Sequence, residues 1–510
     1  MFVRKNRNRN GSISIQVISK RGGQYRVAKS FGASRDPDKL AQMALAAEEY
    51  VLNPAGQMPL FSILTKEDLT IQNFLEGLSN FQIHTIGPEL IFGNLFDRIG
   101  FNELPDKLFR HITIARLAYP SSKLKTVDYL YRYRGIKISD EKVYRFLDKL
   151  NSEYKTQVET IAYQHSLKLL GGNITVVFYD MTTLYFEAED EDDLRKIGYS
   201  KDGKFQQPQI MLGLLVGKGG LPIGYDIFEG NKFEGHTLLP ILAKIQSKYH
   251  FGKPVVVADA GLLSNDNLEE LAAADYKYIL GARVKNETDE VKKQILELAS
   301  VKTDGDSFII KKDKGVKLIV TYSEKRAKKD FHNREKGLKK LRVAVKSGKL
   351  TKEQIHNRGY NKFLNLTGSV TIDIDEDKIM ADEKWDGLKG YVTNTRLKPK
   401  DIVEHYGHLW QIEKAFRISK TDLRIRPVYH RLRKRIEAHI CIAFVAYSIF
   451  KELERLLQKH QAGFSPHRAA ELTHNMYEVE YTLPQSRQQR LTLLKMDFQQ
   501  NRLYEIIRKN

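Results

Sequence analysis

Two apolar stretches that each lead into an aspartate constrain the fold of this chain most strongly. Residues 174–180 (ITVVFYD) and 255–261 (VVVADAG) are rich in β-branched and aromatic residues and carry no charge before Asp180 and Asp259. Uninterrupted runs of this kind are typical of strands that are buried on both faces of a sheet. They predict a sheet covered by helices, with a carboxylate at the end of each of two strands.

The segments around these stretches alternate between strand and helix patterns. Residues 209–217 and 221–230 predict a hairpin that turns at 218–220, and the order continues as strand, helix, strand up to residue 283. After a change of pattern, residues 390–395 predict another strand, and helical spacing follows over 401–420 and 431–457. The fold class is therefore α/β, with a core made of residues 170–284 and 390–430.

Three further regions flank or interrupt this core. Residues 1–150 begin with alternating stretches typical of a β hairpin and become helical from Asp36. Residues 285–389 hold short strands around a basic helical stretch, and residues 431–510 are helical. We expect an N-terminal region, an inserted subdomain and a helical C-terminal region.

The positive charge of the chain is concentrated rather than spread. The net charge is +20, and the segment 325–358 contributes thirteen Lys or Arg against three acids. Residues 414–435 hold nine cations against Asp422, and the first thirty residues hold eight cations and no acid, among them Arg4, Lys5, Arg7 and Arg9. A single basic run is usually a solvated helix face, but three runs indicate binding to the phosphates of DNA.

Cysteine usage and hydropathy indicate the compartment. The single cysteine, Cys441, excludes an internal disulfide and fits a reducing environment. The longest apolar stretch, residues 440–450, is too short to cross a bilayer, and residues 1–14 lack a hydrophobic signal core. We expect a cytoplasmic protein without membrane insertion.

A paired-carboxylate site is the chemistry that these residues favour. Each aspartate alone has the plain interpretation of a turn or helix cap, but two carboxylates on adjacent strand ends can hold two Mg²⁺ ions for phosphoryl chemistry. The third acid is predicted to be Glu413. On a continuous helix it shares a face with five other side chains, and the alternative is a surface ion pair of Glu413 with Arg417. The five are Tyr406, Trp410, Phe416, Arg417 and Lys420.

Five stretches of the chain resemble insertion-sequence transposases of the Asp-Asp-Glu class: YDMTTLYFE, residues 198–231, VVVADAGLLSNDNL, WDGLKGYVTNT and residues 406–430. Within that class the chain resembles the bacterial group-four insertion sequences, whose helix carries Tyr, Arg, Glu and Lys at fixed spacing. Tyr406, Glu413 and Lys420 match this pattern, whereas Leu409 stands at the Arg position. Whether Arg417 takes over the phosphate contact stays open.

The resemblance implies a ribonuclease H-like core, a mostly β insertion, and Asp180, Asp259 and Glu413 as a triad that binds two Mg²⁺ ions, for which Mn²⁺ can substitute. It also implies a tryptophan that stacks on an extruded base, for which Trp385 is the candidate and a core tryptophan the alternative. Thr393 and Asn394 lie on the strand that leads towards Glu413, where positioning and capping roles are both open. The acidic run 187–193 is of the kind that is usually a solvated loop, and three histidines, His236, His405 and His408, lack a paired metal-ligand spacing.

The function expected from these features is DNA transposition. The chain would bind the terminal inverted repeats of its element through its N-terminal region, pair the ends as a homodimer, and cut and rejoin strands in the bacterial cytoplasm, associated with the nucleoid. Two alternatives stay open: a ribonuclease H-like nuclease without strand transfer, and an inactive DNA-binding descendant of a transposase. The presence of all three acids counts against the second alternative.

Overall fold

The chain forms two compact units. The computed structural model describes residues 1–52, 65–200, 203–262, 264–347, 350, 359–367 and 371–509. The smaller unit consists of Met1–His84 with Tyr477–Leu494, and the larger unit consists of Thr85–Met476 with Lys495–Asn510. The predicted N-terminal region 1–150 is thus shared between the units.

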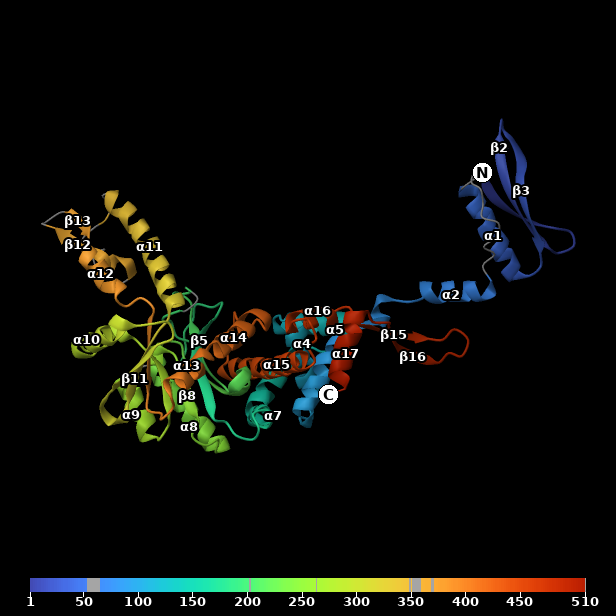
Figure 1. Ribbon diagram of the computed structural model, residues 1–510. Coiled ribbons are helices and arrows are strands. Elements are labelled where there is room, and N and C mark those ends of the chain that lie inside the picture. The colour runs from blue at the N-terminus through green and yellow to red at the C-terminus, as the bar shows by residue number, and fades with distance from the viewer. Residues whose placement is uncertain are drawn as a thin grey trace. The chain divides into compact units, whose positions relative to one another are not determined.

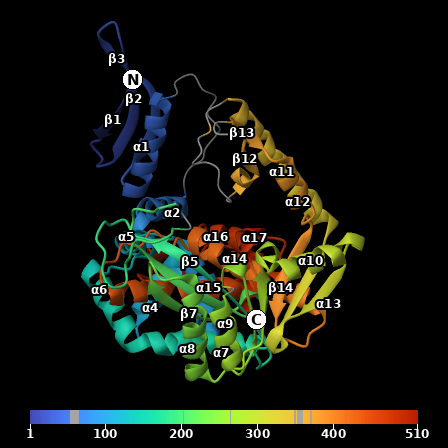
Figure 2. The same ribbon diagram turned by 90° about the vertical axis from the view of Figure 1, so that its left-hand side faces the viewer.

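The smaller unit contains two small sheets. Strands β1 (Phe2–Arg7), β2 (Ile13–Arg21) and β3 (Gln24–Ser34) form an antiparallel sheet, and α1 (Pro37–Leu52) packs on one face of it through Ala47 against Ile15 and Val17. Figures 1 and 2 show α1 running along this sheet. The second sheet pairs β15 (Tyr477–Thr482) with β16 (Gln489–Leu493) and β4 (Ile83–Thr85), next to α2 (Lys66–Glu76).

An eight-stranded mixed sheet is the centre of the larger unit. Its order is β10-β11-β14-β9-β8-β5-β6-β7, and the pairs β5–β8 and β8–β9 are parallel while the others are antiparallel. The bounds are β5 Val176–Tyr185, β6 Gln209–Val216, β7 Pro222–Glu229, β8 Val255–Ala258, β9 Tyr278–Ala282, β10 Ser307–Lys311, β11 Lys317–Tyr322 and β14 Leu388–Thr393. Strand β5 continues five residues beyond Asp180, because the apolar residues that follow are paired along β6. Asp180 therefore lies within a strand and not at its end, as the sequence had suggested.

Helices cover both faces of this sheet (Figure 1), and alternate residues of each strand belong to different buried clusters. Val177 and Val256 pack with α8 (Leu238–Tyr249), α9 (Asn265–Ala273) and α10 (Asp289–Leu298). Phe178 and Val257 pack on the other side, with α13 (Pro399–Gly407), α14 (Trp410–Arg417) and α15 (Arg433–Lys459). Burial on both faces explains the uninterrupted apolar runs of β5 and β8.

A layer of helices continues from α15 away from the sheet. The apolar residues of α15, such as Ile442 and Leu453, are fully buried against the helices that precede β5. None of the helices in the described ranges is long and apolar enough to cross a membrane. The other helices of this layer are α3 (Asn94–Ile99), α4 (Lys107–Ala118), α5 (Lys123–Arg134), α6 (Asp140–Lys149), α7 (Lys155–Leu169), α16 (Pro466–Thr473) and α17 (Phe498–Arg508).

The segment 285–389 differs from the predicted mostly β insertion. Its strands β10 and β11 extend the large sheet, and its longest element is the helix α11 (Glu324–Lys346), in which Lys, Arg, Glu and Ala favour helix. The short pair β12 (Leu364–Thr367) and β13 (Thr371–Ile374) and the helix α12 (Glu376–Glu383) complete it. The end of the predicted basic segment, residues 348–358, lies outside the described residues except for residue 350.

The helix predicted over 401–420 is interrupted. Helix α13 ends at Gly407, the N–H of Leu409 bonds the carbonyl of Tyr406 at 3.0 Å in a tight turn, and α14 begins at Trp410. A π-helical turn, Ile418–Asp422, follows α14. Tyr406 and Glu413 therefore belong to different helices.

Candidate functional site

Strands β5 and β8 bring Asp180 and Asp259 together. In their parallel register Tyr179 lies opposite Ala258. The residues that follow, Asp180 and Asp259, are therefore neighbours across the two strands. Neighbouring strands are about 4.8 Å apart. Both aspartates are partly buried, and the carboxylate of Asp259 accepts the N–H of Gly261 at 2.9 Å.

The two aspartates lie on the face of the sheet that α13 and α14 cover. Phe178 and Val257 pack on that face, and side chains two residues apart in a strand share a face. Asp180 follows Phe178 by two residues, and Asp259 follows Val257 by two. The broken helix that carries Tyr406 and Glu413 packs on this same face.

Tyr406 connects Asp259 with Glu413. Its side chain lies so close to β9 that a Cβ atom at Gly281 would be 2.5 Å from the Tyr406 hydroxyl and 3.0 Å from the backbone N of Ala260. Burial raises the pKa of Tyr406 well above its ordinary value, and the negative charges of Asp259 and Glu413 raise it further. The phenol is therefore protonated at neutral pH and lies within electrostatic reach of both carboxylates.

Glu413 reaches the site from α14, which packs on β5 and β6. The residue is exposed, and its charge acts on both Tyr406 and Lys389. Across the described ranges, however, no set of three or more Asp, Glu, His or Cys side chains is close enough to hold one metal ion. Tyr406 thus links Asp259 and Glu413 electrostatically, but the acids of the described residues do not form a closed metal shell.

Glu234 is a site residue that the sequence analysis did not identify. A Cβ atom at Gly261 would lie 3.0 Å from an Asp259 carboxylate oxygen and 3.2 Å from an oxygen of Glu234. Glu234 and Asp180 both act on buried Tyr179, whose hydroxyl donates to Thr237 at 2.8 Å. Glu234 lies in the short 3₁₀ turn Glu234–His236 between β7 and α8, where no hydrophobic pattern marks it.

The other predicted residues around Glu413 have different surroundings. Leu409, at the Arg position of the group-four pattern, is 8% exposed and belongs to the apolar core. Trp410 is 52% exposed and lines a cavity of about 190 Å³ with Lys414 and Lys451. Arg417 is exposed and acts on Asp422, while Lys420 is partly buried in the π-helical turn.

Trp385, Thr393 and Asn394 are not brought to the acids. Trp385 packs against the core on the α8–α10 side of the sheet, which is the opposite face. The Thr393 hydroxyl donates to the carbonyl of Tyr278 at 2.6 Å, and Asn394 bonds the N–H of Tyr278 and the carbonyl of Tyr276 at 3.0 Å each. Thr393 and Asn394 thus tie the end of β14 to the start of β9.

The predicted DNA-binding residues of the N-terminus lie in the smaller unit. Arg4, Lys5 and Arg7 are exposed on β1, and Arg9 is exposed in the turn that follows. The Lys20 ammonium lies 5.3 Å from the ring centroid of Tyr25, which is 60% exposed. The sheet therefore presents cations and an aromatic side chain to solvent.

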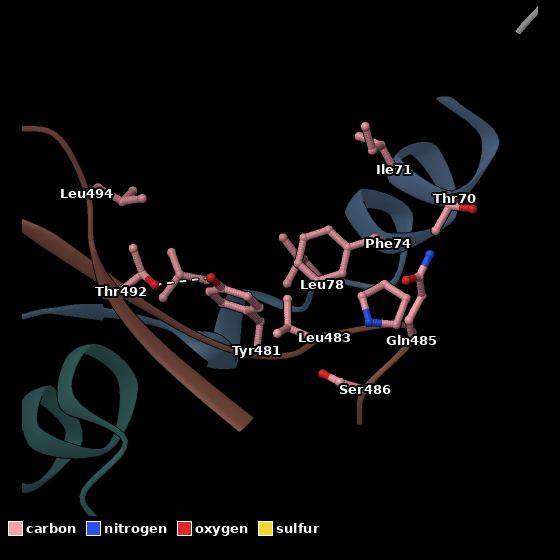
Figure 3. Close-up of a pocket in the computed structure, with 12 residues that line it drawn as sticks. Thr70, Ile71, Phe74, Leu78, Tyr481, Leu483, Gln485, Ser486, Thr492 and Leu494 are labelled. Carbon is pink, nitrogen blue, oxygen red and sulfur yellow. Dashed lines mark hydrogen bonds between the residues drawn. The ribbon is translucent and has the colours of Figure 1, made fainter. Parts of the chain in front are cut away.

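The smaller unit also has an apolar pocket of about 600 Å³ (Figure 3). Phe74 and Leu78 line it from the α2 side, and Leu483 and Tyr481 line it from the β15 side. The Tyr481 hydroxyl and Thr492 are hydrogen-bonded at 3.1 Å. None of the residues that line this pocket is charged.

Comparisons with known proteins indicate the family of this chain. The sequence model of the transposase DDE domain matches residues 171–449, more than half of the chain, and this range contains Asp180, Asp259 and Glu413. The transposase for insertion sequence element IS231E of Bacillus thuringiensis subsp. finitimus is 26% identical over 180 residues, which are 34% of this chain and 36% of that protein. The match thus spans about a third of the relative.

Two solved structures are similar over parts of the chain. A cryo-EM structure of the piggyBac transposase synaptic complex with hairpin DNA aligns at 9% identity over 76% of both chains, with a TM-score of 0.39. The crystal structure of the Mos1 mariner paired end complex with Mn aligns at 12% identity over 46% of this chain and 72% of that one, with a TM-score of 0.14. By the match to residues 171–449, the chain belongs to the transposase DDE domain family, as the sequence motifs predicted.

Proposed function

We propose that this chain is a DNA transposase that cuts strands at the ends of its insertion sequence and joins them to target DNA. The observation that carries the proposal is that Asp180 and Asp259 directly follow the paired residues Tyr179 and Ala258 of parallel strands, and that Asp259 and Glu413 both act on Tyr406. The strand order β7-β6-β5-β8-β9, three antiparallel strands followed by two parallel ones, supports a ribonuclease H-like core.

The donor set fits divalent metal ions. Carboxylate oxygens are the ligands that Mg²⁺ prefers, and Asp259 and Glu413 take part in no ion pair within the described part of the chain. Asp180, Asp259 and Glu413 would hold the ions, two in our proposal, with Mn²⁺ able to replace Mg²⁺. When bound, such ions supply Lewis acidity to a phosphoryl group and lower the pKa of a bound water.

The protein groups of the site have separate tasks. The N–H of Gly261 donates a hydrogen bond to Oδ1 of Asp259. This bond occupies one lone pair of Oδ1 and fixes the orientation of the carboxylate, including its other oxygen. The protonated phenol of Tyr406 donates a hydrogen bond to an oxygen of the reacting phosphate or of a carboxylate. Glu413 is exposed and so approaches the DNA from the open side of the site.

DNA recognition belongs to the basic surfaces in this proposal. Arg4, Lys5, Arg7 and Arg9 contact the terminal inverted repeats, and a homodimer holds the two ends together for strand transfer. Arg417 and Lys420 follow Glu413 on the same segment and bind DNA phosphates near it. Trp410, in the first turn of α14, packs on the DNA backbone. The expected location is the bacterial cytoplasm, at the nucleoid.

A product analysis tests the proposal. A marker flanked by the DNA that borders the gene is incubated in Mg²⁺ with wild type, with Glu413→Gln, and with Glu404→Gln, a matched change at an exposed acid of α13. Wild type and Glu404→Gln should give joined products, and Glu413→Gln should give none while still binding the ends. Cleavage without joining identifies a nuclease, and end binding without any product identifies an inactive descendant.

A further inference from the structure

Two cations, Lys389 and Arg326, lie near Tyr406, and the sequence analysis gave neither of them a role at the site. Lys389 is the second residue of β14, and Arg326 lies in the first turn of α11. The charge of Arg326 acts on both Lys389 and Tyr406, and the charge of Glu413 acts on the same two residues. Helix α11 belongs to the segment 285–389 that interrupts the core, and β14 begins at the end of this segment.

The register of the sheet places Lys389 at the site. Tyr391 pairs with Gly281 of β9 and packs on the α13–α14 face, so Lys389, two residues earlier, shares that face. Its ammonium lies 4.4 Å from the ring centroid of Tyr406 and 5.4 Å from that of Tyr391. The two rings themselves are 4.8 Å apart, edge to face. Lys389 is thus held over the phenol that reaches Asp259.

Arg326 is brought to Lys389 by the pairing of β11 with β14. Thr321 lies opposite Lys389 in this pair, and α11 begins three residues later. The N–H of Ser323 donates to the carbonyl of Gly387 at 3.0 Å, and the Cβ of Ala327 lies 2.9 Å from where a Cβ of Gly387 would be. The first turn of α11 is therefore packed on the start of β14.

A second contact holds α11 in this position. Arg334 is 4% exposed and forms a bidentate pair with Asp386 at 2.6 and 2.8 Å, and it also reaches Glu383 at 3.2 Å. Figures 1 and 2 show α11 running away from the sheet with its first turn next to the strands. Arg326 is presented at the sheet end of a fixed helix.

The charges around these cations favour an anionic ligand. Burial lowers the pKa of Lys389 and the charge of Arg326 lowers it further, whereas Glu413 opposes the shift. The ion pair of Arg326 in the described residues is with Asp330, at 3.6 Å, and that carboxylate also accepts the N–H of Gly387 at 3.2 Å. A phosphate relieves the repulsion between two cations that the fold holds close together.

We propose that Lys389 and Arg326 together bind one backbone phosphate of the DNA next to Glu413, so that the inserted helix α11 supplies a substrate contact to the active site. This assignment rests on the proposed function, because the ligand is the DNA that the site acts on. It predicts that both residues serve the same phosphate.

The test removes charge from the protein and from the DNA in turn. Lys389→Gln, Arg326→Gln and the double variant are compared with Lys328→Gln, which removes an exposed cation two residues further along α11. The probe is a duplex of the DNA that borders the gene, with single phosphates replaced one at a time by neutral methylphosphonates. End binding and strand cleavage in Mg²⁺ are both measured.

In wild type and Lys328→Gln, one methylphosphonate position near the cleaved bond should slow cleavage about 10- to 100-fold and weaken binding measurably. In the double variant the same position should have no further effect, since the partner charges are already absent. Lys389→Arg should retain most of the wild-type rate.

An interference pattern that is the same in wild type and the double variant would overturn the proposal. The measurement of end binding tests the phosphate contact even if wild type cuts no DNA. In that case the proposed function fails, but the proposed contact of Lys389 and Arg326 is still tested. A variant that does not fold is recognised by its unfolding curve, and the single variant Arg326→Gln, at an exposed residue, then carries the comparison.

Discussion

At the residue scale, the acids of this chain differ in what neutralises them. Glu452 is 1% exposed and accepts hydrogen bonds from Arg455 at 2.7 Å, and buried Glu454 pairs with Lys414 and Lys451. Asp259, although partly buried, has a backbone N–H as its partner. Acids that stabilise the fold are paired with cations of the chain, whereas Asp259 takes part in no ion pair within the described residues and can accept a ligand cation.

Glu452 should make folding sensitive to acid. Its burial would raise the pKa, but the bonds from Arg455 and the nearby His165 outweigh burial and lower the pKa to about 2. A lowered pKa stabilises the fold above the unfolded value, near 4.5, and this stabilisation is lost as the pH falls through about 2. At neutral pH it amounts to about 3 kcal/mol.

Urea unfolding from pH 7 to 2 measures this contribution. Glu452→Gln should lower the free energy of unfolding at pH 7, and its difference from wild type should narrow below pH 4.5. Glu297→Gln, at a 65% exposed side chain, is the control and should follow wild type throughout. A constant difference between Glu452→Gln and wild type at all pH values would contradict the assignment.

Tyr406→Phe isolates the phenol hydroxyl. The Phe ring keeps the edge-to-face contact with Tyr391 and the contact with Lys389, so stability should change little. Loss of the donor should slow strand cleavage about 10-fold or more without a matching loss of end binding. Because the pKa of Tyr406 is raised, the wild-type rate should show no decline from phenol ionisation up to pH 10.

At the element scale, the close approach of α13 to β9 sets where Tyr406 lies. Gly281→Ala would place a Cβ 2.5 Å from the Tyr406 hydroxyl and 3.0 Å from the backbone of Ala260, so the Tyr406 side chain must move. We expect a loss of about 1–3 kcal/mol of stability and a lower cleavage rate. Gly407→Ala is the matched control, since its Cβ would meet nothing within 4 Å; equal activity of the two variants would contradict the prediction.

The strands and the broad helix pattern were predictable because they depend on local hydrophobic sequence. Within residues 174–180 and 255–261, the positions that the sheet buries on both faces are apolar. This pattern can be recognised in the sequence without knowing which strands pair. The addition of β10 and β11 to the large sheet was not predicted, because strand pairing between distant segments leaves no local signal. The break at Leu409 was missed because the spacing over 401–420 fits one helix and two short helices equally.

The candidate site was predictable only in part. Asp180 and Asp259 stand out as the first charges after apolar runs, and a motif marks Glu413. Glu234 and Lys389 lie near these acids through a turn and through strand register, which a sequence pattern does not reveal. The assignment of roles to Arg417, Lys420 and Trp410 stays a prediction.

At the scale of the whole molecule, the excess charge of +20 is useful for DNA binding only where it meets phosphates. The N-terminal sheet exposes four cations in its first nine residues, and the larger unit carries other exposed lysines on the α9–α10 side. Two quadruple variants with the same net charge therefore separate local contacts from the overall field. The first replaces Arg4, Lys5, Arg7 and Arg9 with Gln, and the second replaces Lys253, Lys277, Lys293 and Lys314 with Gln.

Both variants change the net charge from +20 to +16, so a purely long-range effect would weaken end binding equally in the two. If the N-terminal cations bind phosphates, their removal should reduce the slope of log affinity against log salt by about 0.9 for each phosphate that is no longer neutralised, up to four phosphates. The second variant should keep the wild-type slope, because its lysines release no counterions on binding. Titrations of the end duplex at several salt concentrations measure both slopes, and equal slopes would assign end recognition to another surface.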